Sequence, residues 1–324
     1  MNIQKIGILT SGGDSPGMNA AIRAVVRSGI QSGFECYGIL HGYQGLLQKD
    51  LIPLDAGSVA NTIQRGGTFL KAGRCQEMYQ AEGRKLAAEN FKSLGLDALV
   101  TIGGDGTYTG ALALTEEHGV PVLGLPGTID NDIFGTDYTI GFDTAVNTAL
   151  EAIDRIRDTA ASHDRLFIVE VMGRESGFIA VDVALAGGAE AVFIPENFTS
   201  IDATIQHIRQ GIARGKMSSI LVASEGQNPG RAYDLAEQIR RKSQFEAKVC
   251  VLGHVQRGGS PTARDRIMAS RMGGMAVECL KKGELGVMIA EQKGELVTVP
   301  LKSVIGKTKK VPPQMMSLAE VLST

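Results

Sequence analysis

Three glycine-bearing segments, each following a short apolar run, contain the residue types that bind phosphate and metal ions. The first, residues 10–17, reads Thr-Ser-Gly-Gly-Asp-Ser-Pro-Gly, and we expect Ser15 to cap a helix with Pro16 at its first position. A helix entered in this way directs free backbone N–H groups toward an anion. Taken alone, the segment indicates no more than an ordinary turn between a strand and a helix.

The second segment, residues 103–107, repeats this design as Gly-Gly-Asp-Gly-Thr. Three glycines around Asp105 leave backbone amides for phosphate oxygens and one carboxylate for Mg²⁺. The alternative is that Asp105 only caps the helix that follows. The segment is not a Walker A loop, and it is not a GxGxxG loop, because Gly110 comes one residue late.

The third segment, residues 126–132, reads Pro-Gly-Thr-Ile-Asp-Asn-Asp. Alternate residues of an extended chain share a side, so Thr128, Asp130 and Asp132 are expected to face one cleft. Clustered carboxylates without a nearby lysine or arginine are electrostatically costly unless a cation or a proton transfer uses them. One acid can therefore serve as a general base while the other helps to hold Mg²⁺. A polar turn rich in helix caps is the alternative.

Arginines lie in comparable glycine-bearing turns. Arg74 follows Gly66-Gly67-Thr68, Arg174 follows Met172-Gly173, and His254 and Arg257 lie between Gly253 and Gly259. Guanidinium groups suit the neutralisation of phosphate. Singly, each is typical of a solvated surface, but together with the glycine-rich loops they favour phosphate binding.

Short apolar runs alternate with helical patterns along nearly the whole chain. Strands are expected at Lys5–Leu9, Glu35–Leu40, Ala98–Ile102, Val120–Leu125, Leu166–Val171, Ala191–Ile194, Ser219–Ala223, Lys248–Leu252 and Val287–Ala290. Helices are expected at Pro16–Gln31, Tyr108–Glu117, Asp143–Thr159, Ile201–Ala213, Tyr233–Lys242 and Pro261–Leu280. This alternation predicts an α/β protein of two domains with parallel sheets covered by helices, and ligands at the carboxyl ends of strands.

The amino-acid composition argues against several classes of protein, among them nucleic-acid-binding and membrane-spanning proteins. Glycine accounts for 41 of 324 residues, well above the usual ~7%, which indicates many tight turns or close approaches of backbone to a ligand. The net charge of -2 argues against a nucleic-acid partner. No apolar run is long enough for a membrane span, and the start is unlike a signal peptide. Four scattered cysteines, Cys36, Cys75, Cys250 and Cys279, indicate reduced thiols in a cytoplasmic protein.

In combination, six motifs resemble the bacterial-type ATP-dependent 6-phosphofructokinases: residues 10–14, 65–68, 103–107, 126–132, 172–174 and 253–260. The similarity covers nearly the whole chain. It implies two three-layer αβα Rossmann-like domains with the active site in the cleft between them. The larger, ATP-binding domain would comprise residues 1–141 and 256–306, and the smaller, sugar-phosphate-binding domain residues 142–255 and 307–324. It further implies a cytoplasmic homotetramer that transfers the ATP γ-phosphoryl group to the 1-hydroxyl of fructose 6-phosphate.

The resemblance also assigns roles. For Mg-ATP it implies Gly13, Tyr43, Arg74, Cys75, Gly104, Asp105, Gly106 and Thr107, with Asp105 near the metal. For catalysis it implies Asp130 as base, with Thr128, Asp132, Arg174, Arg74 and Gly13. For the sugar phosphate it implies Thr128, Ile129, Asp130, Met172, Gly173, Arg174, Glu225, His254, Val255, Gln256 and Arg257, with Arg165 and Lys248 reaching a neighbouring subunit's site.

An effector site for ADP, GDP or phosphoenolpyruvate is also implied. Its residues would be Arg23, Ala24, Val25, Val26, Arg27, Arg157, Gly188, Ala189, Glu190, Arg214 and Lys216, while Ala56, Asn61 and Ser218 depart from the family pattern. A solvated helix face is the alternative for Arg23 and Arg27. Lys248, standing where an arginine is expected, loses the bidentate fork.

Gly106 and Gly127 stand where pyrophosphate-using members of the family tend to carry Asp and Lys, which favours ATP as the donor. Two other readings stay open. One is a pyrophosphate-dependent or different-sugar kinase on the same scaffold. The other is a non-catalytic sensor of sugar phosphates or nucleotides, against which the acids at 105, 130 and 132 speak.

Overall fold

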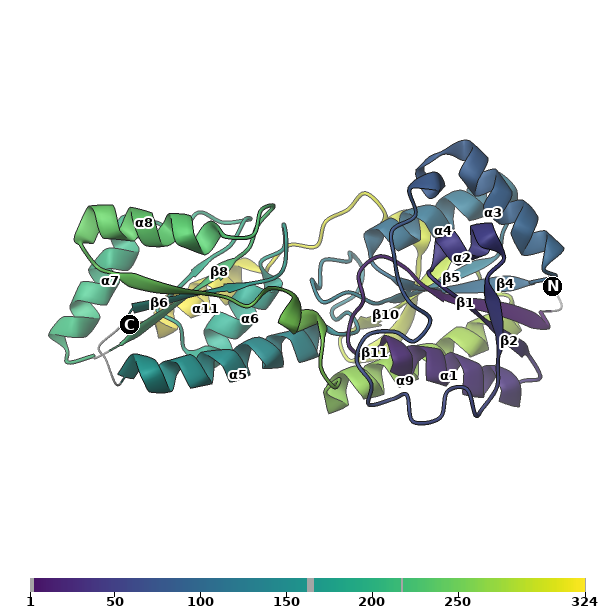
Figure 1. Ribbon diagram of the computed structural model, residues 1–324, viewed down its shortest axis with the longest axis horizontal. Coiled ribbons are helices and arrows are strands. Elements are labelled where there is room, and N and C mark those ends of the chain that lie inside the picture. The colour runs from purple at the N-terminus through teal and green to yellow at the C-terminus, as the bar shows by residue number, and fades with distance from the viewer. Residues whose placement is uncertain (1–2, 162–165, 217, 324) are drawn as a thin grey trace. The chain divides into compact units, whose positions relative to one another are not determined.

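The computed structural model describes residues 3–161, 166–216 and 218–323, and the chain divides into two compact units. The first comprises Met1–Ile129, Ile133–Asp143 and Arg257–Lys309, and the second comprises Asp130–Asp132, Thr144–Gln256 and Lys310–Thr324 (Figure 1). The sequence suggested bounds within three residues of these, but it assigned residues 130–132 to the larger domain. In the structure these three residues group with the second unit.

The first unit is built on a seven-stranded sheet in the order β11-β10-β5-β4-β1-β2-β3. Five of its strands are parallel: β1 (Lys5–Thr10), β2 (Glu35–Ile39), β4 (Ala98–Gly103), β5 (Val122–Pro126) and β10 (Val287–Gln292). The two edge strands, β3 (Leu51–Leu54) and β11 (Glu295–Pro300), are antiparallel to their neighbours. The central strands are apolar and buried along their length, as expected of parallel strands covered on both faces.

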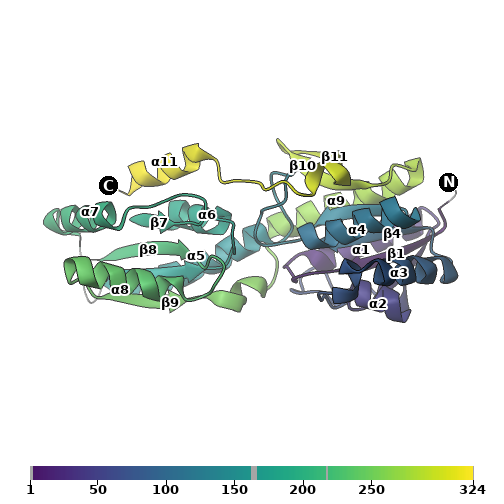
Figure 2. The same cartoon turned by 90° about the horizontal axis from the view of Figure 1, so that it is seen from above.

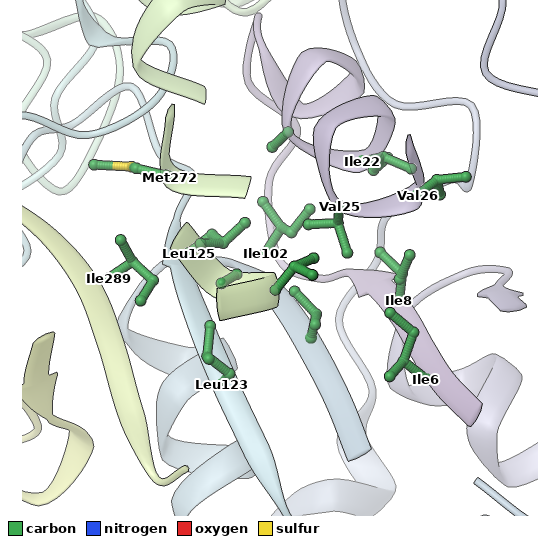
Figure 3. Close-up of a cluster of buried hydrophobic side chains, with 14 of the residues drawn as sticks. Ile6, Ile8, Ile22, Val25, Val26, Ile102, Leu123, Leu125, Met272 and Ile289 are labelled. Carbon is green, nitrogen blue, oxygen red and sulfur yellow. The ribbon is translucent and has the colours of Figure 1, made fainter. Parts of the chain in front are cut away.

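Helices cover both faces of this sheet (Figure 1). On one face lie α1 (Met18–Gln31) and α9 (Ala263–Lys282), and on the other α2 (Tyr43–Gln48), α3 (Ala81–Ser93) and α4 (Asp105–His118). The elements η1 (Gln76–Tyr79) and α10 (Leu301–Val304) are short. Ile6 and Ile8 of β1 belong to the core beneath α1 and α9, where Val25 and Met272 also lie (Figure 3), whereas Leu9 belongs to the opposite core. This alternation fixes the register of the strand.

The second unit contains a four-stranded, fully parallel sheet in the order β7-β8-β6-β9. Its strands are β6 (Leu166–Val171), β7 (Ala191–Phe193), β8 (Ser219–Ser224) and β9 (Ala247–Val251). The helices α7 (Ile201–Ala213) and α8 (Arg231–Ser243) share one core with the sheet. Within this unit, α5 (Phe142–Ala161) and α6 (Phe178–Gly187) lie on the opposite face, and α11 (Pro313–Leu322) contacts α6 (Figure 2).

The α/β class with mainly parallel sheets is confirmed, and each expected strand corresponds to an observed one within a few residues. The expected start of the first helix is wrong. Gly17, in the left-handed region at φ 105°, is the N-cap, so α1 begins at Met18 and Ser15 caps nothing. No helix in the described ranges combines the length and apolar character needed to cross a bilayer.

Candidate active site

The first two glycine turns lie at the same end of adjacent parallel strands. Thr10 at the end of β1 pairs with Ile102 near the end of β4, so the turns that follow both strands leave the sheet together. Thr107 links them, because its hydroxyl donates to the Ser11 carbonyl at 3.2 Å. A Cβ at Gly103 would lie 2.3 Å from that hydroxyl oxygen, so this link requires glycine at 103. The sequence segments 10–14 and 103–107 therefore form one structural feature.

Tyr43 and Cys75 are buried in the core on the α4 side of the sheet, next to the second of these turns in the case of Tyr43. Tyr43 is 3% exposed, and its hydroxyl donates to the Thr107 carbonyl at 2.7 Å. Burial raises the pKa of Tyr43 far above its ordinary value. Cys75 is also buried, with its Sγ 3.5 Å from Gln44 Oε1, and burial raises its pKa to about 11. Both side chains are thus occupied in the protein, and their expected contact with a nucleotide stays a prediction.

Asp105 is the carboxylate that the second turn offers to a cation. It is the first residue of α4, and Gly104 is the N-cap. Partial desolvation raises the pKa of Asp105 above its ordinary value, and a nearby cation would oppose this shift. The described residues include no cluster of three or more His, Cys, Asp or Glu side chains able to hold a metal. Asp105 nevertheless fits Mg²⁺, which is commonly held by one or two carboxylates together with substrate phosphates.

The third turn follows β5, which pairs with β4 through Gly103 and Pro126. The hydroxyl of Thr139, itself almost fully buried, donates to the Thr128 carbonyl at 2.6 Å and fixes the start of the turn. A Cβ at Gly127 would lie 3.0 Å from both Ile102 and Met18. A side chain at 127 would therefore need Ile102 and Met18 to shift by a few tenths of an ångström, and the expected role of Gly127 in leaving room for a nucleotide stays a prediction.

In the second unit, three further turns leave the sheet at one end, since Val171 pairs with Ser224 and Glu170 with Val251. Met172–Arg174 follows β6, Glu225 follows β8, and His254 lies beyond β9 in the short helix η2 (Gly253–Arg257). The backbone N–H of Arg174 donates to Glu225 Oε1 at 3.3 Å. The exposed Arg174 side chain projects from a backbone in the left-handed region, at φ 51°.

Asp130 belongs to this second group. It is 5% exposed, and its carbonyl accepts a hydrogen bond of 2.8 Å from the hydroxyl of Ser176. Burial is the main cause that raises the pKa of Glu225, and the charge of Asp130 raises it further. The structure thus brings together Asp130, Arg174 and Glu225, three of the residues expected to act on the acceptor substrate.

Gln256 is a buried support for the same turns. Its side-chain oxygen accepts from the Met172 N–H at 2.8 Å, and its side-chain nitrogen donates to the Ala145 carbonyl at 3.3 Å. Because both ends of the amide are occupied, Gln256 is better explained as a positioning residue than as a direct ligand. The neighbouring Val255, by contrast, is 62% exposed.

Arg257 does not group with Asp130, Arg174 and Glu225, which belong to the second unit. It groups with the first unit, where its Nη1 donates to the Asp14 carbonyl at 3.2 Å. A Cβ at Gly13 would lie 2.5 Å from the same nitrogen. The guanidinium therefore covers the first glycine turn, and its expected role in binding the sugar phosphate stays a prediction.

Lys248, one of the expected sugar-phosphate residues, is not brought to this end of the second sheet. Lys248 pairs with Phe167 near the start of β6, at the opposite end from Met172 and Glu225. It lines a cavity of about 590 Å³ together with Lys216, a residue expected in the effector site. Arg165 lies outside the described residues.

The expected effector residues divide into two groups. On α1, Arg23 and Arg27 reach solvent, but the side chains of Ala24, Val25 and Val26 are buried in the core and unavailable to a ligand (Figure 3). In the second unit, Lys216 pairs with Glu190 at 2.5 Å, and Arg157 donates to the Gly187 and Gly188 carbonyls. Ala189 is buried, while Arg214 is exposed beyond the end of α7.

The sequence argument missed three residues at these turns. Thr139 and Ser176 hold the backbone of the acidic segment, and no local pattern marks a hydroxyl that acts on a distant carbonyl. Lys71 lines a cavity next to the first glycine turn. Its place three residues before Arg74 was a signal that could have found it.

Two adjacent parallel strands with glycine turns at their carboxyl ends define an α/β protein with an anion-binding edge. The model of the family described as "Phosphofructokinase" matches residues 5–280. The chain belongs to the phosphofructokinase family.

Relatives of the chain agree with this membership. The chain is 56% identical over 321 residues to "ATP-dependent 6-phosphofructokinase 1" of Thermus thermophilus, covering 99% of this chain and all of that protein. It is 50% identical over 321 residues, with the same coverage, to the "ATP-dependent 6-phosphofructokinase" of Shouchella clausii.

Among solved structures, the phosphofructokinase of Saccharomyces cerevisiae superposes with a TM-score of 0.86 at 37% identity, over 93% of this chain. This chain spans only 45% of that yeast chain's length. A pyrophosphate-dependent phosphofructokinase from Marinobacter aquaeolei superposes with a TM-score of 0.83 at 24% identity, over 96% of this chain and 86% of that one, which shows the fold alone.

Proposed function

We propose that this chain transfers the γ-phosphoryl group of ATP to the 1-hydroxyl of fructose 6-phosphate, giving fructose 1,6-bisphosphate and ADP. Its full-length relatives at 50–56% identity bear the name of this activity. The observation that carries the proposal is the link between the turns after β1 and β4, in which Thr107 donates to the Ser11 carbonyl. This link holds two sets of backbone amides at one edge of the sheet, as a polyphosphate requires.

The donor side consists of residues in the first unit. The backbone of Gly13, Gly104, Gly106 and Thr107 would bind phosphate oxygens, and the exposed Arg74 would neutralise them. A Cβ at Gly106 would meet nothing within 4 Å, so space is open there for a ligand to approach the backbone. Mg²⁺ bound beside Asp105 would supply charge neutralisation for the transferred group.

The acceptor side consists of Asp130, Arg174 and Glu225, with His254 in the turn that follows β9 at the same end of the sheet. Asp130 would accept the proton of the attacking hydroxyl, and Glu225 would accept a hydrogen bond from the sugar. Arg174 would stabilise the negative charge of the group in transfer, because its side chain is exposed and its backbone is held by Glu225. Phosphoryl transfer depends mainly on alignment and charge neutralisation, which these residues can provide.

A pyrophosphate donor is the second candidate, since proteins of the same fold carry that name. The open space at Gly106 favours the bulkier nucleotide, as do the names of the more similar relatives. A coupled assay for fructose 1,6-bisphosphate, with ATP or pyrophosphate as donor, separates the two. We expect turnover with ATP. Turnover with pyrophosphate but not with ATP would identify pyrophosphate as the donor. No turnover with either donor would favour the non-catalytic sensor of sugar phosphates or nucleotides.

The role of Asp130 is tested by Asp130→Asn, which keeps the size of the side chain and removes its basicity. We expect kcat to fall by about 10²–10⁴-fold, the range typical of a general base. Asp202→Asn is the matched control, because Asp202 is an exposed carboxylate of the same unit, paired with Lys242. Parental kcat in the Asp130 variant would remove this residue as the base.

We also propose a cytoplasmic homotetramer whose effector, ADP, GDP or phosphoenolpyruvate, binds at Arg23, Arg27 and the residues around Glu190. The free thiols of all four cysteines favour a reducing compartment. The place of Lys248, away from the other sugar-phosphate residues, favours its action on a neighbouring subunit. Light scattering tests the tetramer, and the double variant Arg23→Ala, Arg27→Ala is expected to blunt the effector response while sparing basal activity.

A further inference from the structure

A cavity of about 390 Å³ opens beside the first glycine turn of the first unit. It is lined by Gly12, Gly13, Asp14, His41, Thr68, Lys71 and Ala72. Part of the wall is therefore the backbone of the turn after β1, and another part is the neighbouring segment 68–72. Two of its lining side chains, those of His41 and Lys71, can carry positive charge.

The segment that carries Lys71 is held tightly against the glycine turn. Thr10, which is fully buried, donates to the Lys71 carbonyl at 2.7 Å, and its hydroxyl oxygen lies 3.0 Å from that of Thr68. The Gly12 N–H donates to the Gly73 carbonyl at 3.2 Å. Lys71 therefore projects from a fixed backbone, so the binding of a ligand would have to order only its side chain.

The backbone of Lys71 also adopts a conformation that is uncommon for a residue with a side chain. Its φ is 63°, in the left-handed region, and His41 on the same cavity has φ 57°. Lys49 has a similar φ of 58°, but it is the C-cap of α2, where that conformation is usual. Lys71 follows no helix, and such strain is concentrated at functional sites.

The charge of Lys71 is not used within the protein. Among the described residues, no ion pair or hydrogen bond involves its Nζ, and its side chain is exposed. Asp14 lines the same cavity, yet no ion pair joins the two side chains in the part of the chain that the structure describes. An unpaired lysine next to bare backbone amides is suited to phosphate, which lysine binds as a point charge.

We propose that Lys71 is a further binding residue for the polyphosphate chain of the nucleotide. The inference rests on the proposed function, because it assumes that the first glycine turn holds the donor phosphates. Lys71 would approach these phosphates from the segment 68–73, which is hydrogen-bonded to the Gly12–Gly13 turn and lines the same cavity. It adds to the charge neutralisation assigned to Arg74 and lies three residues before it in the chain.

The test is Lys71→Met, which keeps the apolar stem and removes the charge. We expect KM for ATP to rise about fivefold to tenfold, with kcat and KM for fructose 6-phosphate within twofold of the parent. KM for GTP is expected to rise by the same factor, because the contact is to phosphate and not to the base. The Kd of ATP, measured by calorimetry without turnover, is expected to rise in parallel. The effect is expected to shrink at 0.5 M KCl, where an exposed charge is screened.

Two further variants separate the outcomes. Lys71→Arg keeps the charge and is expected to retain most of the affinity. Lys49→Met removes an exposed lysine with the same backbone conformation and is expected to behave as the parent. An unchanged KM and Kd for ATP in Lys71→Met would overturn the inference, and so would a change only in the melting temperature, which would mean that Lys71 balances Asp14. If the proposed function itself were wrong, the parent protein would show no turnover, and this result differs from every outcome that would overturn only the role of Lys71.

Discussion

The hydroxyl of Ser176 donates to the backbone carbonyl of Asp130 at 2.8 Å, and both residues are at most 5% exposed. Ser176 is fixed in turn, because its N–H donates to the Gly173 carbonyl at 2.8 Å and its carbonyl accepts from Ser224. One residue thus connects the acidic segment to the turn that carries Arg174. The hydrogen bond from the Ser176 hydroxyl fixes the position of the Asp130 backbone relative to that turn.

Ser176→Ala is therefore expected to lower kcat about threefold to tenfold, while KM for ATP stays within twofold of the parent. Loss of one neutral hydrogen bond corresponds to about 0.5–1.5 kcal/mol, which is the origin of this range. Ser224→Ala is the matched control, because it removes a buried hydroxyl of the same cluster that does not reach Asp130. Steady-state kinetics of both variants check the prediction, and equal losses in the two would mean a general packing effect. Ser176→Cys, a weaker donor, is expected to lie between the parent and Ser176→Ala.

Gly106→Ala is expected to separate folding from nucleotide binding. The added methyl group meets nothing within 4 Å, and Gly106 lies in the first turn of α4, where alanine is favoured by about 0.5–1 kcal/mol. The melting temperature should therefore stay the same or rise. KM for ATP should nevertheless increase severalfold, because the methyl group occupies the space through which phosphate approaches the backbone. Thermal unfolding with and without ATP measures both effects, and unchanged ATP affinity would show that the ligand stays clear of residue 106.

Gly13→Ala and Gly66→Ala are expected to fail in different ways. At Gly13 the new Cβ would lie 2.5 Å from Arg257 Nη1, the movable end of a side chain, so the fold should tolerate it while the guanidinium is displaced. At Gly66 it would lie 2.2 Å from the Gly259 carbonyl oxygen, which is backbone. We expect Gly13→Ala to keep its melting temperature and lose about tenfold in kcat/KM. Gly66→Ala is expected to melt at least about 4 °C lower. The reverse pattern in calorimetry and kinetics would refute the packing argument.

The raised pKa of Glu225 should be visible in the pH dependence of the free energy of unfolding. Burial, aided by the charge of Asp130, raises the pKa of Glu225 in the folded protein. Below the ordinary glutamate pKa of about 4.3 both states are protonated and the group costs nothing. As pH rises past that value the unfolded state ionises first, so the free energy of unfolding falls until the folded pKa is passed.

Glu225→Gln removes the ionisable group, and with it this pH-dependent decrease in the free energy of unfolding. The variant keeps a side-chain oxygen that can accept from the Arg174 N–H. The variant should therefore melt at a higher temperature than the parent at pH 7.5, with a difference that narrows as the pH falls toward the ordinary glutamate pKa of about 4.3. Its kcat/KM for fructose 6-phosphate should decrease, because the charged acceptor is lost. A melting difference that does not depend on pH would contradict the assigned cause.

Much of the fold follows from local sequence, and the exceptions depend on pairing with remote segments or on backbone conformation. The sequence patterns also did not predict the helices α2, α3, α6, α10 and α11. The apolar runs that became β1, β4 and β5 were detectable because both faces of these strands are covered. The two strands that the sequence did not reveal, β3 and β11, are half-exposed edges whose pairing depends on neighbours remote in the chain. The start of α1 was misjudged because Gly17 adopts a positive φ, which composition alone does not indicate.

Some features of the candidate site could likewise be predicted from local sequence, and others depend on tertiary structure. The glycine turns were recognisable because their residue types are constrained at consecutive positions. The grouping of Asp130 with the second unit, and the contact of Arg257 with Asp14, depend on tertiary structure and have no local signature. Gly127 is also closely packed against Met18, a contact that its place in the sequence did not indicate.

The interleaving of the two units along the chain has a consequence for synthesis on the ribosome. Helix α1 buries Ile22 and Val25 in a core that includes Met272 of α9, yet α9 is made only after residues 144–256 have emerged. At ordinary translation speeds this delay is on the order of tens of seconds. Throughout that time the apolar face of α1 lacks the cover that α9 provides, so the unit whose synthesis starts first must wait for most of the second unit before its core can form. Co-translational chaperones should engage nascent chains that end between residues 31 and 263.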